Sequence, residues 1–189
     1  MTSNDHDRPW TARRRTRLTA SSVLLAACLV VTSGLPAHAD YYAGGMPKTT
    51  FNVRYVAVND QWTQHFNDSR ARWNNTSGTG VSIGKTTTAA ATMTASRYNE
   101  SWYGLYSPSG VRGINRVFSI KINARTLSDN AGGNLTAWIN STSTHELGHA
   151  LSLSDNPDTT KASLMKHSRN RTTVIKPQAY DISEVKRIY

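Results

Sequence analysis

The sequence predicts an α+β fold in which helices pack on a twisted, mixed β-sheet. Two segments, 50–55 and 116–124, alternate apolar and polar residues as half-buried strands do. Three others, 61–74, 135–153 and 178–189, space their apolar residues as amphipathic helices do. Strands are grouped before the second helix, and the chain shows neither an internal repeat nor a domain linker. This order indicates one layered domain.

Residues 1–39 predict a secretory signal peptide rather than part of the fold. An arginine-rich start at 13–17 precedes an apolar core at 23–31, and a small-x-small cleavage site follows at 37–39. The apolar core is shorter than the roughly 20 residues that a helix needs to cross a bilayer. We therefore expect cleavage at that site and a secreted domain at 40–189, without a stable membrane span.

A lipid anchor at Cys28 is the alternative form of export, because segment 25–28 is similar to the lipidation motif of bacterial lipoproteins. Cys28 is the only cysteine, so the exported domain would depend on its core and on any bound metal. That domain carries 17 Lys and Arg against 10 Asp and Glu. No dense basic run with interleaved aromatic residues appears, which argues against nucleic-acid binding. We expect a monomer.

The exported domain is expected to begin with a strand and a helix. Segment 50–55 is the strand, and the helix at 61–74 would be capped by Asp60. The buried face of this helix is expected to consist of Trp62, Phe66 and Trp73.

Strands and loops are expected to alternate in the middle of the chain. A Thr-rich β-region begins at 78–84 and continues at 91–98, whereas Gly, Pro, Ser and Tyr at 102–113 indicate a loop. The strand at 116–124 would place Phe118, Ile120 and Ile122 on one face. Segment 128–134, rich in Gly, Asn and Asp, is expected to be a loop that leads into the next helix.

The helix expected at 135–153 contains the run His145-Glu146-Leu147-Gly148-His149. Residues four apart share a helix face, so the two imidazoles would point at one spot, as zinc ligands do. Glu146 would reach a water bound to the same ion and act as its general base. The run therefore predicts a zinc hydrolase that needs a third protein ligand.

Extended to Asp155, the run resembles the HExxHxxGxxH pattern of the metzincin zinc peptidases. It is most similar to the HExxHxxGxxD form of snapalysin, a small secreted bacterial protease. The resemblance implies that Asp155 is the third zinc ligand; a plain turn at 155–158 is the alternative. Ser152 stands where the family has Gly. A non-Gly residue that turns through positive φ costs about 1–2 kcal/mol, so Ser152 bears on the placement of Asp155.

Residues nearer the C-terminus extend the resemblance. Met165 is similar to the methionine of the metzincin Met-turn; a core methionine is the alternative. His167 stands where astacins and serralysins have a Tyr, which implies a fourth ligand or a transition-state stabiliser, against a plain surface His. In the helix at 178–189, Asp181 matches an Asp of the matrixin closing helix that supports the Met-turn. Tyr180 replaces the preceding Asp, which implies that the matrixin latch on the N-terminus is absent.

The resemblance is carried by segment 134–189 and implies a metzincin-like single domain. Its expected parts are a twisted mixed five-stranded sheet, an active-site helix, a Met-turn and a C-terminal helix. It implies a zinc metalloendopeptidase, acting on protein or peptide substrates through a zinc-bound water and Glu146. A proteinaceous inhibitor is a further expected partner, because little chain precedes Phe51 in which a pro-domain could fold.

The sequence is also compatible with two other functions and with a second metal ion. A gluzincin-type peptidase would use Glu184 as third ligand, although the NExxSD setting of that family is missing. A non-catalytic basic binding protein of the cell surface would use the positive charge but has no need of Glu146. Ca²⁺ is a second candidate ion, through Asp129, Asn130 and Asn134, with a turn loop as the alternative.

Overall fold

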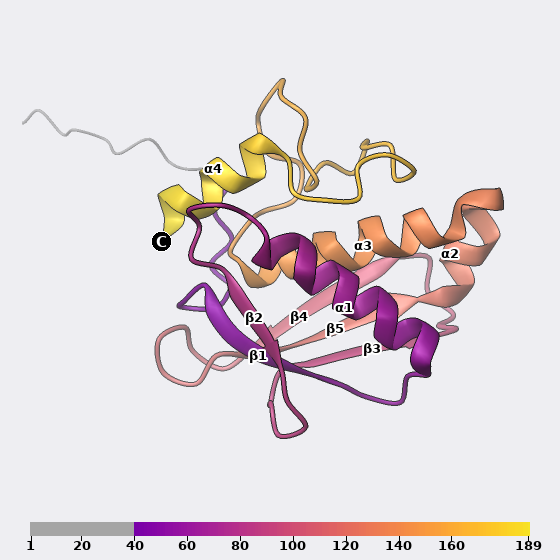
Figure 1. Cartoon of the computed structure of the whole chain (residues 1–189), viewed down its shortest axis with the longest axis horizontal. Coiled ribbons are helices and arrows are strands. Elements are labelled where there is room, and N and C mark those ends of the chain that lie inside the picture. The colour runs from indigo at the N-terminus through magenta and orange to yellow at the C-terminus, as the bar shows by residue number, and fades with distance from the viewer. Residues whose placement is uncertain (1–39) are drawn as a thin grey trace, which may run out of the picture. The chain divides into compact units, whose positions relative to one another are not determined.

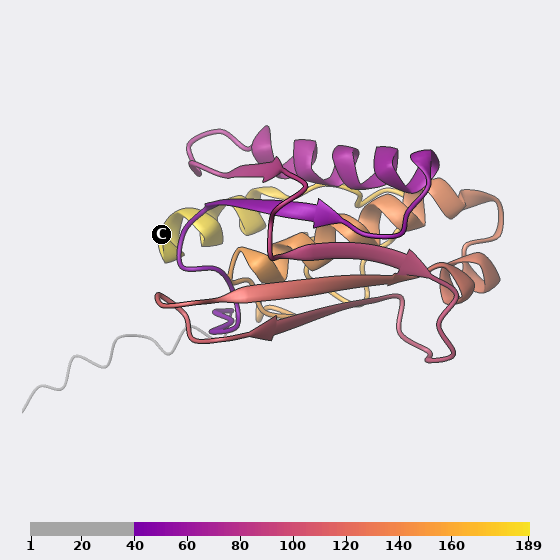
Figure 2. The same ribbon diagram turned by 90° about the horizontal axis from the view of Figure 1, so that it is seen from below.

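The computed structural model describes residues 40–189, which form a five-stranded mixed sheet with helices packed on one face (Figures 1 and 2). The strands are β1 (Thr50–Tyr55), β2 (Ser82–Lys85), β3 (Thr92–Ser96), β4 (Gly104–Ser109) and β5 (Val117–Asn123). Their spatial order is β2-β1-β3-β5-β4; all neighbours are parallel except β4, which runs antiparallel to β5 at the sheet edge. The mixed five-stranded sheet agrees with expectation.

Helices cover one face of this sheet and leave the other to solvent. The helices are α1 (Asp60–Asn74), α2 (Ala124–Asn130), α3 (Leu135–Ala150) and α4 (Ala179–Ile188). Long helices α1 and α3 pack against each other on the same face (Figure 2). Phe66 and Trp73 of α1 meet Leu147 of α3 in the core, and all three are fully buried. The core thus fixes α3, the helix that carries the His-Glu-His run.

Strand β4 corrects the expectation of a loop at 102–113. It pairs along its whole length with β5, with Tyr106 opposite Ile120. Glycine, proline and serine obscure the alternating pattern here, and Pro108 is tolerated because an edge strand has only one neighbour. Strand β4 runs beside α3, the helix that carries the His-Glu-His run.

Two smaller corrections concern helix starts. The loop expected at 128–134 overlaps α2, which begins at Ala124 because the side chain of Asn123 accepts hydrogen bonds from the backbone at positions 125 and 126. A 3₁₀ turn, Gly132–Asn134, then leads into α3. The N-cap of α1 is Asn59, whose Oδ1 accepts from the Trp62 amide at 3.0 Å, so Asp60 is the first helical residue and not the cap.

An N-terminal arm, residues 40–46, runs along the segment that follows α3. The Tyr42 amide donates to the Ser152 carbonyl, and the Met46 amide donates to the Ala150 carbonyl, both at 2.8 Å. The Tyr180 hydroxyl of α4 hydrogen-bonds the Asp40 carboxylate, so the arm and α4 are joined, though by another contact than the matrixin latch. The expected signal peptide and Cys28 lie outside the described residues. Among the described helices, none has the length and apolarity to cross a bilayer.

Candidate metal centre and cleft

Helix α3 places His145, Glu146 and His149 together in the interior. All three residues are at most 8% exposed, and the two imidazole centroids are 4.8 Å apart. The i and i+4 spacing puts both rings on one face, while Glu146 lies one position round the helix. The sequence run therefore forms one cluster, as expected.

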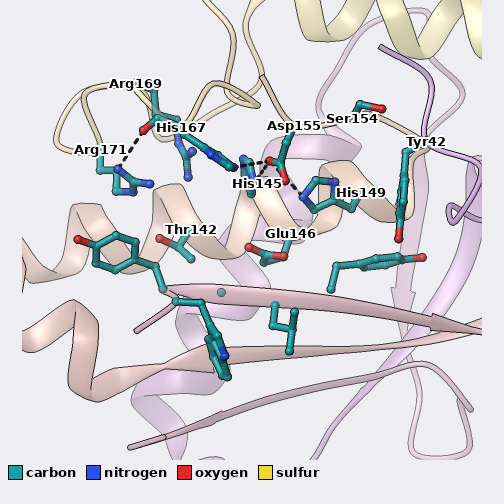
Figure 3. A pocket seen from close by; sticks show the side chains of 15 residues that line it. Tyr42, Thr142, His145, Glu146, His149, Ser154, Asp155, His167, Arg169 and Arg171 are labelled. Atoms are coloured by element: carbon teal, nitrogen blue, oxygen red, sulfur yellow. Dashed lines mark hydrogen bonds and ion pairs between the residues drawn. The ribbon is translucent and has the colours of Figure 1, made fainter. Parts of the chain in front are cut away.

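Asp155 reaches this cluster because the chain reverses sharply after α3. Ser152 adopts φ of +62°, the left-handed conformation that the missing glycine would have supplied. Asp155 Oδ1 then lies 3.0 Å from His145 Nε2 and 3.5 Å from His149 Nε2 (Figure 3). The structure thus brings together the two histidines and the aspartate that the sequence singled out.

The outer nitrogens of both histidines face backbone carbonyls. His145 Nδ1 lies 3.0 Å from the Leu164 carbonyl oxygen, and His149 Nδ1 lies 2.9 Å from that of Leu153. A carbonyl oxygen only accepts, so each Nδ1 donates and each Nε2 keeps its lone pair in the neutral ring. Metal-binding histidines in proteins are oriented in this way.

The donor set fits a zinc ion. In a tetrahedral site with bonds of about 2.0–2.1 Å, ligand atoms lie about 3.3 Å apart, and the two separations from Asp155 Oδ1 bracket that value. Imidazole nitrogen and carboxylate oxygen are the donors of catalytic zinc sites. Within the described residues, atoms of His145, Asp155 and His167 also converge to within 4.8 Å of one another. Proximity alone therefore leaves the choice between His149 and His167 as a ligand open.

His167 is the exposed member of the cluster. Its side chain is 59% exposed, and its Nε2 lies 3.0 Å from Asp155 Oδ1. Its Nδ1 faces the side-chain nitrogen of Asn156 at 3.0 Å, in contrast to the carbonyl partners of His145 and His149.

Without metal, the protonation of the cluster is uneven. Burial, together with the nearby charge of Arg169, lowers the pKa of His145 to about 3. Burial also opposes protonation of His149, but the hydrogen bond to Asp155 and the charge of Glu146 outweigh it and raise its pKa. Burial disfavours the charged form of Asp155, yet its hydrogen bonds to His145 and His149 hold its pKa well below the usual range.

Glu146 is positioned against the edge strand. A side chain on Gly104 of β4 would place its Cβ only 2.3 Å from Glu146 Oε1, so only a glycine leaves room for the carboxylate. Burial raises the pKa of Glu146 to about 7 in the metal-free protein. A carboxyl group with a pKa near neutrality can both accept and return a proton.

Met165 lies against α3 at Gly148. Its side chain is 1% exposed, and its Sδ would be 2.5 Å from a Cβ on Gly148, between the two histidine positions. Asp181 of α4 holds the neighbouring turn, accepting from the Leu164 amide at 2.8 Å and from the Ser163 hydroxyl at 2.5 Å. These hydrogen bonds join α4 to the segment 163–165.

The cluster lies at the floor of a cleft of about 650 Å³ (Figure 3). Strand β4 forms one wall, Tyr42 of the arm lies towards one end, and Arg169 and Arg171 lie towards the other (Figure 3). Within residues 40–189, neither guanidinium forms an ion pair with a carboxylate. No sequence motif points to these lining residues, because they come from separate segments of the chain.

The alternative ligands are engaged elsewhere. Glu184, the gluzincin candidate, pairs with Arg187 and does not line the cleft. Of the residues considered for Ca²⁺, Asp129 lies 3.7 Å from the Arg125 guanidinium, and the Asn130 amide donates to the Thr126 carbonyl.

Comparison with known proteins gives similarity in structure alone. No protein-family model matches the sequence, and a search of curated proteins found no match. A chain of a structure described as the GM1-bound form of the ECX AB5 holotoxin is 11% identical, with a TM-score of 0.56 over 78% of this chain and 83% of that chain. Archaemetzincin from Methanopyrus kandleri is 12% identical, with a TM-score of 0.49 over 74% of this chain and 96% of that chain. The similarity to the holotoxin chain shows a shared fold only, so the function is argued from the residues of the site.

Proposed function

We propose that this protein is a zinc-dependent endopeptidase of the metzincin type, in which His145, His149 and Asp155 bind the metal. The observation that carries the proposal is the convergence of two buried Nε2 atoms and one carboxylate oxygen, with both Nδ1 atoms held by carbonyls. Glu146 lies directly beside this donor set in an open cleft. A binding protein without catalysis has no need of a buried carboxyl group there.

The bound zinc would polarise the scissile carbonyl and lower the pKa of a water molecule in its open position. Glu146 takes the proton of that water and then passes it to the leaving amine. Its burial between α3 and Gly104 keeps bulk water away from the carboxyl group and so supports both transfers.

The substrate binds as an extended strand along β4. One edge of β4 pairs with β5, and among the described strands none pairs with its other edge. Gly104, Leu105 and Tyr106 of this strand line the cleft. A peptide backbone can therefore add to the sheet edge, with its scissile bond beside the metal.

The cationic end of the cleft favours a carboxylate on the substrate. Arg169 is 8% exposed, and Arg171 lies over the rings of Tyr103 and Trp138, at 4.7 and 5.5 Å from their centroids. The Thr142 hydroxyl and Arg171 Nε are buried without hydrogen-bond partners inside the described chain. An acidic side chain next to the cleaved bond would supply both acceptors and negative charge.

The same proposal includes the subtype of the zinc site, the Met-turn and the fate of the protein outside the cell. The Asp155 ligand supports a snapalysin-type site, and the contacts of Asp181 with the turn at Met165 support a Met-turn. We propose that the protein is secreted after removal of residues 1–39, acts as a monomer and is restrained by a proteinaceous inhibitor. The alternative of a lipid anchor at Cys28 is distinguished by the mass of the mature protein.

The test replaces Glu146 by Gln, which keeps the size of the side chain but removes the base. We expect casein or peptide cleavage to fall at least about a hundredfold, the usual contribution of a general base, while zinc content and melting temperature stay close to wild type. Zinc removal with a chelator should abolish wild-type activity and zinc addition should restore it. Cleavage that survives Glu146→Gln, or purified protein without one tightly bound zinc, would refute the proposal.

A further inference from the structure

Asn156 makes two hydrogen bonds to His167, and the first fixes the orientation of its amide. Asn156 Oδ1 accepts from the backbone N–H of His167 at 2.7 Å. A backbone N–H only donates, so the amide oxygen must face it. The amide nitrogen is thereby placed on the side of the imidazole ring.

The second hydrogen bond fixes the tautomer of the ring. Asn156 Nδ2 lies 3.0 Å from His167 Nδ1. An amide nitrogen only donates, so Nδ1 must accept and carries no proton. A neutral imidazole has one N–H, which must then be on Nε2. That Nε2 lies 3.0 Å from Asp155 Oδ1, which is a hydrogen-bond distance between an N–H donor and a carboxylate acceptor (Figure 3).

The backbone at Asn156 is built for these contacts. Asn156 has φ of +47°, a left-handed conformation that Asn and Gly tolerate better than other residues. The backbone N–H of Asn156 donates to the Met165 carbonyl at 3.0 Å. The turn after Asp155 is therefore joined to the segment of Met165 and His167 by both backbone and side chain.

His145 and His149 have the opposite arrangement. Carbonyl oxygens force their Nδ1 atoms to donate, which leaves each Nε2 as a lone pair for metal. A metal ion on Nε2 of His167 would require an N–H on Nδ1, directed at the amide protons of Asn156. The hydrogen-bond partners thus divide the three histidines into two ligands and one donor.

We propose that Asn156 is a positioning residue that holds His167 as an Nε2–H donor, so that His167 stabilises the oxyanion of the transition state and does not bind zinc. The inference rests on the proposed peptidase function. In the metal-free structure this Nε2–H faces Asp155 Oδ1 on the wall of the cleft. Once zinc takes up that carboxylate oxygen, the N–H can turn to the carbonyl oxygen of a bound substrate, on which negative charge develops during attack.

The test reads the tautomer directly and then the kinetics. Long-range ¹H–¹⁵N spectra of histidine-labelled protein at pH 8, where an ordinary imidazole is neutral, distinguish N–H from lone-pair nitrogens. His167 is assigned by loss of its signals in His167→Gln. We expect an Nε2–H tautomer for His167 and Nδ1–H for His145 and His149, with the His167 pattern unchanged on zinc addition.

Two variants separate the side chain from the backbone. Asn156→Gly keeps the left-handed turn but removes the amide, so the tautomer should become mixed. Asn156→Asp keeps the acceptor for the His167 amide but places an oxygen opposite Nδ1, which should move the proton to Nδ1. We expect kcat at pH 8 to fall about 10- to 100-fold in Asn156→Asp and less in Asn156→Gly, with KM and zinc content near wild type.

A double-variant comparison completes the test. In a His167→Gln background, Asn156→Asp should lower kcat no further. An Nδ1–H tautomer of His167 in the wild type, or a zinc-shifted His167 Nε2, would overturn the proposal, as would a tautomer and kcat unaffected by Asn156→Asp. If the wild type cleaves no peptide, the peptidase function fails, whereas the tautomer and zinc spectra still decide the role of Asn156.

Discussion

Ser152 shows how one residue replaces the glycine that a tight turn favours. Its φ of +62° costs a side-chain residue about 1–2 kcal/mol. The hydroxyl offsets this cost: Oγ accepts from Arg112 Nη1 at 2.6 Å and donates to the Tyr189 hydroxyl at 3.0 Å, because that hydroxyl itself donates to Met46. The same turn brings Asp155 to His145 and His149, so the strained residue lies directly before the candidate metal site.

We predict that Ser152→Ala is less stable than Ser152→Gly, the reverse of the usual order. Alanine keeps the strain and loses both hydrogen bonds, which should cost about 2–3 kcal/mol. Glycine loses the same bonds but removes the strain, so it should be about 1 kcal/mol more stable than alanine. Urea unfolding at fixed zinc concentration measures both. Ser154, two residues on and without positive φ, is the control position, where alanine should be the more stable; an identical order at both positions would contradict the argument.

Arg171 is predicted to set a preference for acidic substrates. A charge-assisted hydrogen bond contributes about 1.5–3 kcal/mol, so a peptide with Glu beside the cleaved bond should show kcat/KM at least about tenfold above its Gln counterpart. Arg171→Met keeps the stem over Tyr103 but removes the charge, and should bring the ratio near one. Arg97→Met, an exposed control outside the cleft, changes net charge equally and should leave the ratio intact. A wild-type enzyme indifferent to Glu and Gln would disprove this preference.

At the scale of elements, α3 and the turn at Met165 meet at a glycine. Gly148 is in the helix interior, where Gly→Ala ordinarily stabilises by about 0.5–1 kcal/mol. Here the new Cβ would lie 2.5 Å from Met165 Sδ and 3.4 Å from the ring of Trp73. Met165 is buried, so its side chain can make room only by displacing the core around it, or else the helix and the turn must move apart.

Gly148→Ala should therefore destabilise the protein by about 1–3 kcal/mol, the usual cost of overpacking. It should also weaken zinc binding, because the proposed ligands His145 and His149 lie on either side of Gly148 in α3. In a Met165→Ala background the clash is absent, and the same substitution should become neutral or stabilising. Urea unfolding of the four proteins forms a double-variant cycle. Equal effects of Gly148→Ala in both backgrounds would show that Met165 is not the cause.

The elements also show what a single sequence can and cannot predict. Helix α3 was predictable because its apolar spacing and its His-Glu-His run coincide, whereas Asp155 was implied only by the resemblance to the HExxHxxGxxD pattern. Strand β4 was missed because Gly104 and Pro108 weaken its strand pattern, and its pairing depends on β5 rather than on itself. The partners of the histidine Nδ1 atoms were equally invisible, since Leu164 is nineteen residues from His145 and contributes only a backbone carbonyl.

In the whole molecule, the metal site joins segments that are distant in sequence. The arm at 40–46 pairs with the chain after α3, and α4 holds the turn beneath the histidines through Asp181. Residues 40–189 contain no cysteine, so no disulfide within them helps to hold these segments together. A bound zinc would therefore add to global stability as well as to activity.

Zinc should raise the free energy of unfolding by an amount that grows between about pH 5.5 and pH 8. At a free zinc concentration of 100 times Kd, the gain is about 2.7 kcal/mol. Metal binding must displace the proton that the metal-free site holds on His149, whose pKa is raised by Asp155 and Glu146 against the effect of burial. Each pH unit below that pKa lowers zinc affinity about tenfold, or about 1.4 kcal/mol.

The free energy of unfolding should be compared between the zinc-bound and the metal-free protein, because several groups make the stability of each form depend on pH. His149, with a raised pKa, stabilises the metal-free fold at low pH, and this contribution is lost as pH rises through its folded pKa. His145, with a pKa of about 3, destabilises both forms equally below the ordinary histidine pKa, so its effect cancels in the difference. Asp155 stays ionised throughout this range. Glu146, with a pKa of about 7 in the metal-free protein, also titrates in it, and a nearby zinc ion would favour its ionised form, which adds to the trend in the same direction. Thermal unfolding in zinc buffers of fixed free metal, with and without zinc, measures the gap at each pH; a gap that is constant or narrows towards pH 8 would show that His149 does not exchange a proton for the metal.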